Sequence, residues 1–169
     1  MLAVRRSEGA RVTPIIRAAT VADAQAIANL TVQLGYEADA SGVAERLSHI
    51  LSNPDQRFLV AEIDFRTAGW IHMLRVEYVD HPAFVMIGGL VVDRGHRRQG
   101  IGALLLQRAE EWARQCGCSL VRLSSSATRT EAHRFYESVG YTNVKTQYSF
   151  AKSVDGSDDA ALRALVPRV

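Results

Sequence analysis

The chain has 169 residues, of which 47% are hydrophobic and 22% charged, and its formal net charge is +2. This length suits one domain, and this composition is that of a soluble globular protein rather than a disordered, fibrous or disulfide-stapled one. The longest apolar stretch, residues 83–92, is about half as long as a membrane-spanning helix. Cys116 and Cys118 are too close in sequence for a structural disulfide, and the N-terminus shows no secretory signal, so we expect a cytoplasmic protein.

The charge is divided unevenly along the chain. Residues 20–93 hold ten acids against four arginines, a net of −6, whereas residues 94–152 hold ten Arg or Lys against four acids, a net of +6. A basic half attracts anions and an acidic half attracts cations, unless the charges are only scattered over solvated faces.

The first part of the chain predicts a strand and two helices. Residues 1–13 are expected to be an N-terminal extension, residues 14–154 a single domain, and residues 155–169 a C-terminal tail. A short strand at 15–17 precedes Thr20, an N-cap residue for a helix that has Asp23 in its first turn and ends at Gly35. A second helix is predicted at 42–52, because Pro54 blocks its continuation.

Strand patterns dominate next. Residues 58–63, 69–78 and 83–92 are rich in β-branched and aromatic residues and have short connections, which predicts antiparallel hairpins. A helix at 101–116, a strand at 120–123, a helix at 131–139 ended by Gly140, and a strand at 142–154 follow. Residues 83–123 then form a parallel strand pair with a right-handed crossover. The expected fold class is mixed α/β (α+β), with an antiparallel meander, one parallel pair and helices on both faces of the sheet.

The segment after the strand at 83–92 has the features of an anion site. Arg94, Arg97 and Arg98 precede Gly100 and Gly102 at the start of a helix, where unpaired backbone N–H groups and the helix dipole favour phosphate. Glycine at both positions would let the anion approach the amides. The spacing matches neither the dinucleotide fingerprint nor a nucleotide-triphosphate loop.

A second informative segment is the helix at 131–139. Helical spacing places Ala132, His133 and Tyr136 near one another, with the phenol above a small residue and the imidazole beside it. For a single helix, core packing by Phe135 and Tyr136 is the simpler explanation.

The two segments together, in this order, resemble the GNAT superfamily of acetyl-CoA-dependent N-acetyltransferases. The resemblance implies a GNAT-like sheet around a CoA site, acetyl-CoA as cosubstrate and no metal. It implies that the loop Arg-x-x-Gly-x-Gly binds the CoA pyrophosphate, that the preceding strand binds the pantetheine arm, and that an Ala-x-x-Phe-Tyr helix lies beside the sulfur. Carried over, the cofactor-binding residues are Leu90, Val91, Val92, Arg97, Arg98, Gln99, Gly100, Ile101, Gly102, Ala103, Arg129, Ala132, Phe135 and Tyr136. The family often has asparagine where this chain has Arg129, which leaves the contact of Arg129 with CoA open.

The tyrosine that the resemblance places beside the CoA sulfur, Tyr136, suits the chemistry of amide formation. A tyrosine pKa of about 10, against about 8.5 for a thiol, keeps Tyr136 protonated and able to donate to the leaving sulfur. The oxyanion would be met by the backbone N–H of Val91 or Val92. The strand at 83–92 contains no carboxylate, and the base candidates Glu77, Asp80, His81 and Tyr36, or water held by Ser124 or Ser125, stay open.

The expected reaction is direct acetyl transfer to a primary amine of a small cationic molecule, aminoglycoside- or polyamine-like. The acidic half is expected to attract this amine through Glu37, Asp39, Glu77 and Asp80. Alternatives are a protein N-terminal or lysine acetyltransferase and a non-catalytic acyl-CoA-binding regulatory module. We expect a small-molecule amine as partner, with no nucleic acid and no membrane, and a homodimer is left open. Acyl-chain preference is not encoded in a readable pattern.

Overall fold

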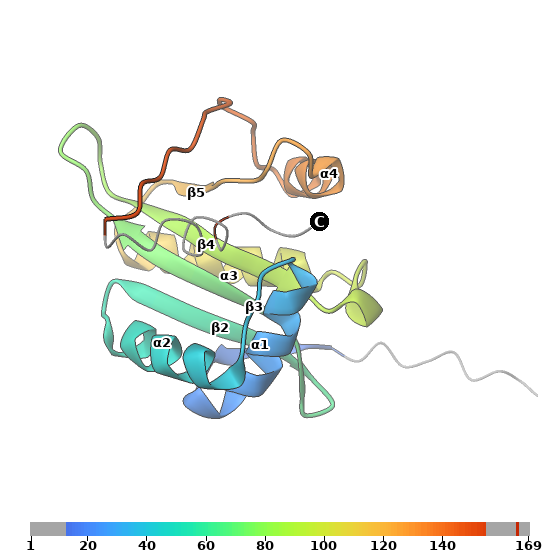
Figure 1. The fold of residues 1–169 in the computed structure, drawn as a ribbon. Helices are drawn as coiled ribbons and strands as arrows, with labels where there is room; N and C mark the ends of the chain where they lie inside the picture. The colour runs from blue at the N-terminus through green and yellow to red at the C-terminus, as the bar shows by residue number, and fades with distance from the viewer. Residues whose placement is uncertain (1–12, 155–164, 166–169) are drawn as a thin grey trace, which may run out of the picture.

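The computed structural model of the chain describes residues 13–154 and residue 165. The predicted extension and tail therefore lie almost entirely outside the described residues. A five-stranded sheet with the order β1-β2-β3-β4-β5 forms the centre, and helices cover both of its faces (Figure 1). This is the mixed α/β architecture that the sequence predicts.

The sheet is an antiparallel meander that ends in one parallel pair. Strands β1 (Ile15–Ala18), β2 (Gln56–Ile63), β3 (Arg66–Val76) and β4 (Phe84–Val92) pair antiparallel in chain order. Strand β5 (Val121–Leu123) pairs parallel to β4 and forms the outer edge. Each predicted strand before residue 124 is confirmed, with ends shifted by a few residues.

Two helices cover one face of the sheet. A 3-10 turn, η1 (Val21–Asp23), leads into α1 (Ala24–Gln33), so the predicted helix begins with a tighter turn than expected. Helix α2 (Ala40–Ser52) is capped by Asp39, whose carboxylate accepts from the Gly42 N–H at 2.8 Å. Their apolar side chains pack on the sheet in one cluster, which includes Ile27, Leu30, Val43, Leu47, Phe58, Val60, Trp70 and Val91.

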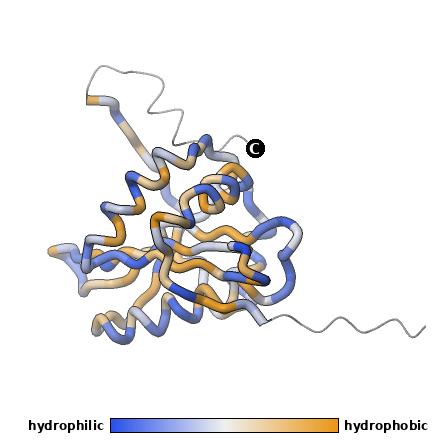
Figure 2. The backbone as a smooth tube through the Cα atoms, turned by 90° about the horizontal axis from the view of Figure 1, so that it is seen from below, coloured by the Kyte–Doolittle hydropathy of each residue, from blue (hydrophilic) through white to orange (hydrophobic). Residues whose placement is uncertain are grey.

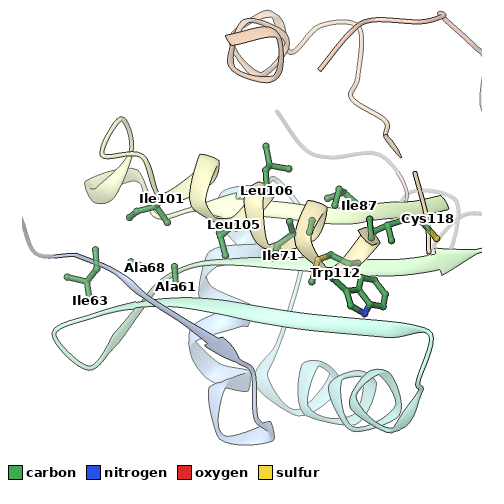
Figure 3. Packing of buried hydrophobic residues seen from close by; sticks show 14 residues of the cluster. Ala61, Ile63, Ala68, Ile71, Ile87, Ile101, Leu105, Leu106, Trp112 and Cys118 are labelled. Atoms are coloured by element: carbon green, nitrogen blue, oxygen red, sulfur yellow. The ribbon is translucent and has the colours of Figure 1, made fainter. Parts of the chain in front are cut away.

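Helix α3 (Ile101–Gln115) covers the opposite face. Its apolar stripe of Ile101, Leu105, Leu106 and Trp112 packs against strand residues such as Ile71 (Figure 3). The strands carry long orange apolar stretches, as expected for a sheet covered on both faces, whereas the helices alternate between orange and blue (Figure 2). Helix α4 (Thr130–Ser138) follows β5, and Phe135 and Tyr136 pack on the edge of this second cluster.

The predicted strand at 142–154 is wrong. No strand is assigned there, and Val144, Tyr148 and Phe150 are 81%, 91% and 92% exposed. Alternation of apolar and polar side chains shows that a segment can form a strand, but a strand also needs a partner edge. The segment leaves α4 and passes beyond β5 without joining the sheet (Figure 1). Within the described residues, no helix has both the length and the apolar character needed to cross a membrane.

Candidate active site

The sheet opens in the middle of β4. Strand β5 pairs with Val85, Met86 and Ile87, and the pairing stops there. At the same level the β3–β4 register shifts between His72 and Met73, so that Gly88 and Gly89 together face His72. Such a bulge bends the strand and ends regular pairing. Among the described residues, the second half of β4 is therefore bonded to β3 on one side and has no paired strand on the other.

Along this half of β4, successive backbone N–H groups point alternately toward β3 and toward the open edge. Asp93 N–H donates to the Ala68 carbonyl at 2.8 Å, and antiparallel pairs alternate between bonded and non-bonded. Val91, opposite Trp70, is therefore in a bonded pair, whereas Leu90 and Val92 direct their N–H groups to the open side. Of the two N–H groups expected to bind the oxyanion, that of Val91 is thus bonded to β3, whereas that of Val92 points toward the open edge.

The loop from Arg97 to Gly100 ends at a helix N-terminus without a side-chain cap. Gly100 has φ +85° and Arg98 has φ +61°, so the loop contains two left-handed residues that turn successive amides toward one side. The first-turn N–H groups of α3, from Ile101 to Ala103, have no intrahelical acceptors. Ile101 is 1% exposed, so its side chain belongs to the core and does not reach a ligand.

Side chains of the loop are exposed and basic. The guanidinium of Arg97 donates from Nε to the Val92 carbonyl at 3.2 Å, which ties the loop to the end of β4. Arg98 and Gln99 are exposed, and Gln99 donates to the Gly95 carbonyl at 3.4 Å. The predicted pyrophosphate residues therefore lie together at the end of β4 and the start of α3.

Gly102 makes a packing contact that the sequence does not predict. A Cβ at this position would lie 2.9 Å from Cζ of Phe135, which is too close for an unshifted structure. The glycine allows α4 to pack against α3, and its expected place beside a bound anion stays a prediction. At Gly100, by contrast, a Cβ would meet no atom within 4 Å, and the positive φ is what favours glycine.

A hydrogen-bond network that the sequence analysis missed fixes the start of the loop. Gln33 of α1 donates to Asp93 at 2.8 Å and accepts from the Arg94 N–H at 3.0 Å. Asp93 also accepts from the Gly95 N–H at 2.8 Å and lies 3.2 Å from Nδ1 of His96. These bonds lower the pKa of the Asp93 carboxyl, that from Gln33 most. In the sequence, the one sign of this network is an aspartate, Asp93, directly after a buried strand.

Helix α4 presents Tyr136 to the edge of the core. Its ring lies 5.3 Å from that of Phe135 and 6.2 Å from that of Tyr141, measured between centroids. Burial raises the pKa of Tyr136, and the positive charge of Arg129 partly offsets this. The phenol therefore keeps its proton at neutral pH. Ala132 is half-buried on the same helix.

The N-terminus of α4 is held by His133 rather than by a cap. Its Nε2 lies 3.0 Å from the Ser126 carbonyl, so the imidazole fixes the turn between β5 and α4 instead of pointing freely toward Tyr136. Arg129 is the exposed N-cap residue and makes no side-chain cap bond. In the same turn, Ser125 Oγ is buried and has no partner among the described residues.

The expected bases and acidic residues do not gather at the opening. Glu77, Asp80 and His81 lie in the β3–β4 hairpin, at the end of β4 opposite to the loop, and Glu77 pairs with Arg75 at 3.3 Å. Tyr36 and Glu37 line a separate cavity of about 400 Å³ in the α1–α2 connection. Asp39 caps α2, and the Gly42 N–H lowers the pKa of its carboxyl.

The arrangement fits an extended ligand with amide groups and a diphosphate, as CoA has. The open edge of β4 can bond an amide-containing arm in the manner of an added strand, and the uncapped α3 N-terminus with its arginines can hold phosphates. The buried Ser125 hydroxyl, which has no hydrogen-bond partner among the described residues, follows β5, the strand that leaves this edge open. Cys116 and Cys118 are free thiols at the far end of α3. No group of side chains that could hold a metal ion occurs among residues 13–154.

Comparison with known proteins gives a consistent result. The model of the acetyltransferase (GNAT) family matches residues 24–141. The chain is 31% identical to an aminoalkylphosphonate N-acetyltransferase of Salmonella typhimurium, over 91% of this chain and 100% of that protein. It is 30% identical to an aminoglycoside N(6')-acetyltransferase type 1 of Stenotrophomonas maltophilia, over 85% of this chain and 96% of that protein.

Solved structures agree on the fold. An aminoglycoside N-acetyltransferase in complex with CoA superposes with a TM-score of 0.75 at 19% identity, covering 89% of this chain and 99% of that one. An aminoglycoside 6'-N-acetyltransferase from Acinetobacter haemolyticus gives a TM-score of 0.73 at 21% identity, with 83% and 99% covered.

Proposed function

The chain belongs to the GNAT family of acetyltransferases and is an acetyl-CoA-dependent N-acetyltransferase, and from this premise we propose that its acceptor is a primary amine of a small cationic molecule. Aminoglycosides and polyamines are the chemical types that this describes. The acetyl group passes directly from the thioester to the amine while both substrates are bound.

One observation carries the choice of a small acceptor. The relatives that align over nearly the whole chain are named as enzymes of small amines, whereas the ribosomal protein bS18-alanine N-acetyltransferase of Escherichia coli aligns over only 45% of it. This supports a small molecule over a protein N-terminus or lysine.

Charge supports a cationic acceptor. An aminoalkylphosphonate carries an anionic group beside its amine, whereas an aminoglycoside or polyamine carries several ammonium groups. The net charge of −6 over residues 20–93, which include α1, α2 and their connection, favours the second type. Arg17, which lies outside these residues, pairs with Asp23 and Glu62 and so reduces this field, whereas Arg75, which pairs with Asp55 and Glu77, is already counted in the net charge.

In the proposed reaction, the chain positions acetyl-CoA and stabilises charge as it develops. The amides at the start of α3, with Arg97 and Arg98, hold the pyrophosphate. Outward N–H groups of Leu90 and Val92 bond the pantetheine arm and the thioester carbonyl oxygen. Tyr136 donates its phenol proton to the departing sulfur.

A panel of amines tests the acceptor. Purified protein with acetyl-CoA is offered an aminoglycoside, a polyamine, an aminoalkylphosphonate and a peptide with a free N-terminus, and release of free CoA is measured. We expect the aminoglycoside or polyamine to give the highest kcat/KM. A preference for the phosphonate or the peptide would refute the cationic small-molecule assignment. Tight acetyl-CoA binding without turnover of any amine would instead support the non-catalytic module.

A further inference from the structure

His72 lies where the sheet opens, on β3 opposite the bulge at Gly88 and Gly89. Its half-buried ring stacks on Phe58, with centroids 5.5 Å apart. Nε2 lies 2.8 Å from Oε1 of Gln56 on β2. Because an amide oxygen only accepts hydrogen bonds, Nε2 carries the proton of the neutral ring and Nδ1 carries the lone pair.

The lone pair on Nδ1 of His72 is directed toward Gly88 of β4. A Cβ at Gly88 would lie 3.1 Å from Nδ1, so the glycine leaves this nitrogen uncovered where any other residue would cover it. Gly88 is also an exposed residue within an otherwise largely buried part of β4. A ligand that reaches Gly88 from this face of the sheet can therefore reach Nδ1.

The surroundings keep the ring neutral. Burial lowers the pKa of His72 below its ordinary value of 6.5. The residues that surround the ring on β2, β3 and β4 are uncharged: Gln56, Phe58, Leu74 and Gly88. On neighbouring elements, Arg57 stacks on Trp112 of α3, Arg75 pairs with Asp55 and Glu77, and the α2 residues Glu45, Arg46 and His49 are exposed.

We propose that Nδ1 of His72 is the general base that takes a proton from the ammonium group of the acceptor. The inference rests on the proposed amine acetylation and supplies the base that the sequence analysis left open. It places the amine on the α1–α2 face of the sheet, at Gly88, next to the β4 edge that would hold the thioester. Gln56 is a positioning residue, because its oxygen selects the tautomer that leaves Nδ1 free.

The protons and bonds balance. The ammonium gives one proton to Nδ1, and the neutral amine then attacks the acetyl carbon, so that a C–N bond forms and the C–S bond breaks. The CoA sulfur takes the phenol proton of Tyr136, which is restored by the second proton lost from the nitrogen as the amide forms. His72 returns its proton to water, so one proton is released per amide.

The first test replaces His72 by Gln, which retains a polar group toward Gln56 but is not basic. We expect kcat/KM for the amine to fall about 10²- to 10⁴-fold. In the pH profile of kcat/KM, the decrease toward acidic pH (the acidic limb), which reports protonation of the base, should disappear. The wild-type limb should lie below pH 6.5, since burial lowers the pKa of the base. CoA affinity by calorimetry and Tm should stay near wild type. The matched control is His81→Gln in the exposed hairpin, which should keep the wild-type limb.

A second variant keeps the test decisive if His72→Gln does not fold. In Gln56→Glu a carboxylate accepts the Nε2 proton and stabilises the imidazolium, so the acidic limb should move upward by about one pH unit or more. A purely structural histidine would not move it. Independently of turnover, nitrogen NMR of the imidazole at pH 7.5 should show Nε2 protonated and Nδ1 bare.

Three outcomes separate the proposals. An unchanged pH profile in His72→Gln, loss of the limb in His81→Gln, or a protonated Nδ1 at pH 7.5 would overturn the role of His72 and leave acetyl transfer intact. Failure of the wild-type protein to acetylate any amine would overturn the proposed function itself, and the base with it.

Discussion

Two opposing effects act on the phenol of Tyr136. Burial raises its pKa, the charge of Arg129 lowers it, and burial is the larger effect. The proton is therefore present over the neutral and mildly alkaline range, as donation to a thiolate requires. We expect Tyr136→Phe to lower kcat about 10²-fold, the low end of general-acid effects, because a thiolate leaves fairly well unaided. The KM for acetyl-CoA should change little. Tyr148→Phe, at a 91% exposed tyrosine, is the matched control, and a wild-type kcat in Tyr136→Phe would exclude the role.

The two glycines of the loop should respond differently to the same substitution. Gly100→Val places a side chain among the amides that we propose bind the pyrophosphate and strains a left-handed residue, so we expect CoA to bind at least about tenfold more weakly, or 1.4 kcal/mol. Gly102→Val instead collides with Phe135 and should displace α4, lowering both Tm and kcat. Calorimetry with CoA and thermal unfolding of both variants check this. Unchanged CoA affinity in Gly100→Val would contradict the anion loop.

Among the elements, β1 is joined to the start of α1 through Arg17. Its guanidinium bonds both oxygens of Asp23, at 2.8 and 2.9 Å, and Glu62 of β2 at 2.8 Å. Asp23 is only 8% exposed, and Arg17 lowers the pKa of its carboxyl. A lowered pKa stabilises the fold above the ordinary value of 3.8, and this stability is lost as the pH falls through the folded value.

We therefore expect Asp23→Asn to lower the free energy of unfolding by about 1–3 kcal/mol at pH 7. The difference between variant and wild type should shrink as the pH falls from 3.8 through the lower pKa of the folded state, because the Asp23 carboxyl takes up its proton in the unfolded chain first. Urea unfolding at several pH values measures this. A difference that does not depend on pH would show that the ion pair contributes nothing.

Most of the elements, but not all of their contacts, could be predicted from the sequence. Helices and strands up to residue 139 could be predicted because each repeats a local apolar period and ends at a local signal such as Gly35, Pro54 or Gly140. The segment 142–154 has the same kind of period but no partner strand. His72 could not be found, because only the strand register and its bulge bring it to Gly88. The contact between Gly102 and Phe135 could not be found either, because Phe135 lies on another helix.

In the whole molecule, the charge split is retained in part. The basic half contributes the loop arginines and Arg129 near the proposed cofactor path, whereas several acids of the other half form ion pairs. The cytoplasmic location and the homodimer stay predictions. If the remaining field attracts the acceptor, kcat/KM for a cationic amine at saturating acetyl-CoA should fall as salt rises, since the screening length drops from about 10 Å at 0.1 M to about 3 Å at 1 M.

Neutralising acids tests the same field without salt. Asp80→Asn in the hairpin and Glu37→Gln in the α1–α2 connection should each lower kcat/KM for the cationic amine and leave that of a neutral amine unchanged. The connection should matter more, because it lies on the side where α1 meets the end of β4 (Figure 1). A preferred acceptor that is neutral or acidic, or indifference to salt and to both variants, would refute the charge argument.

The one-sided bonding of β4 beyond Ile87 links folding to substrate supply. A ligand laid along this edge binds only the native state, so at 100 times its dissociation constant it would add about 2.7 kcal/mol to the free energy of unfolding. Deuterium exchange would resolve this amide by amide. The outward N–H groups of Leu90 and Val92 should exchange faster without CoA and slow on its addition, whereas that of Val91, bonded to β3, should be protected in both states. The free energy of unfolding of the protein would then rise and fall with the concentration of acetyl-CoA.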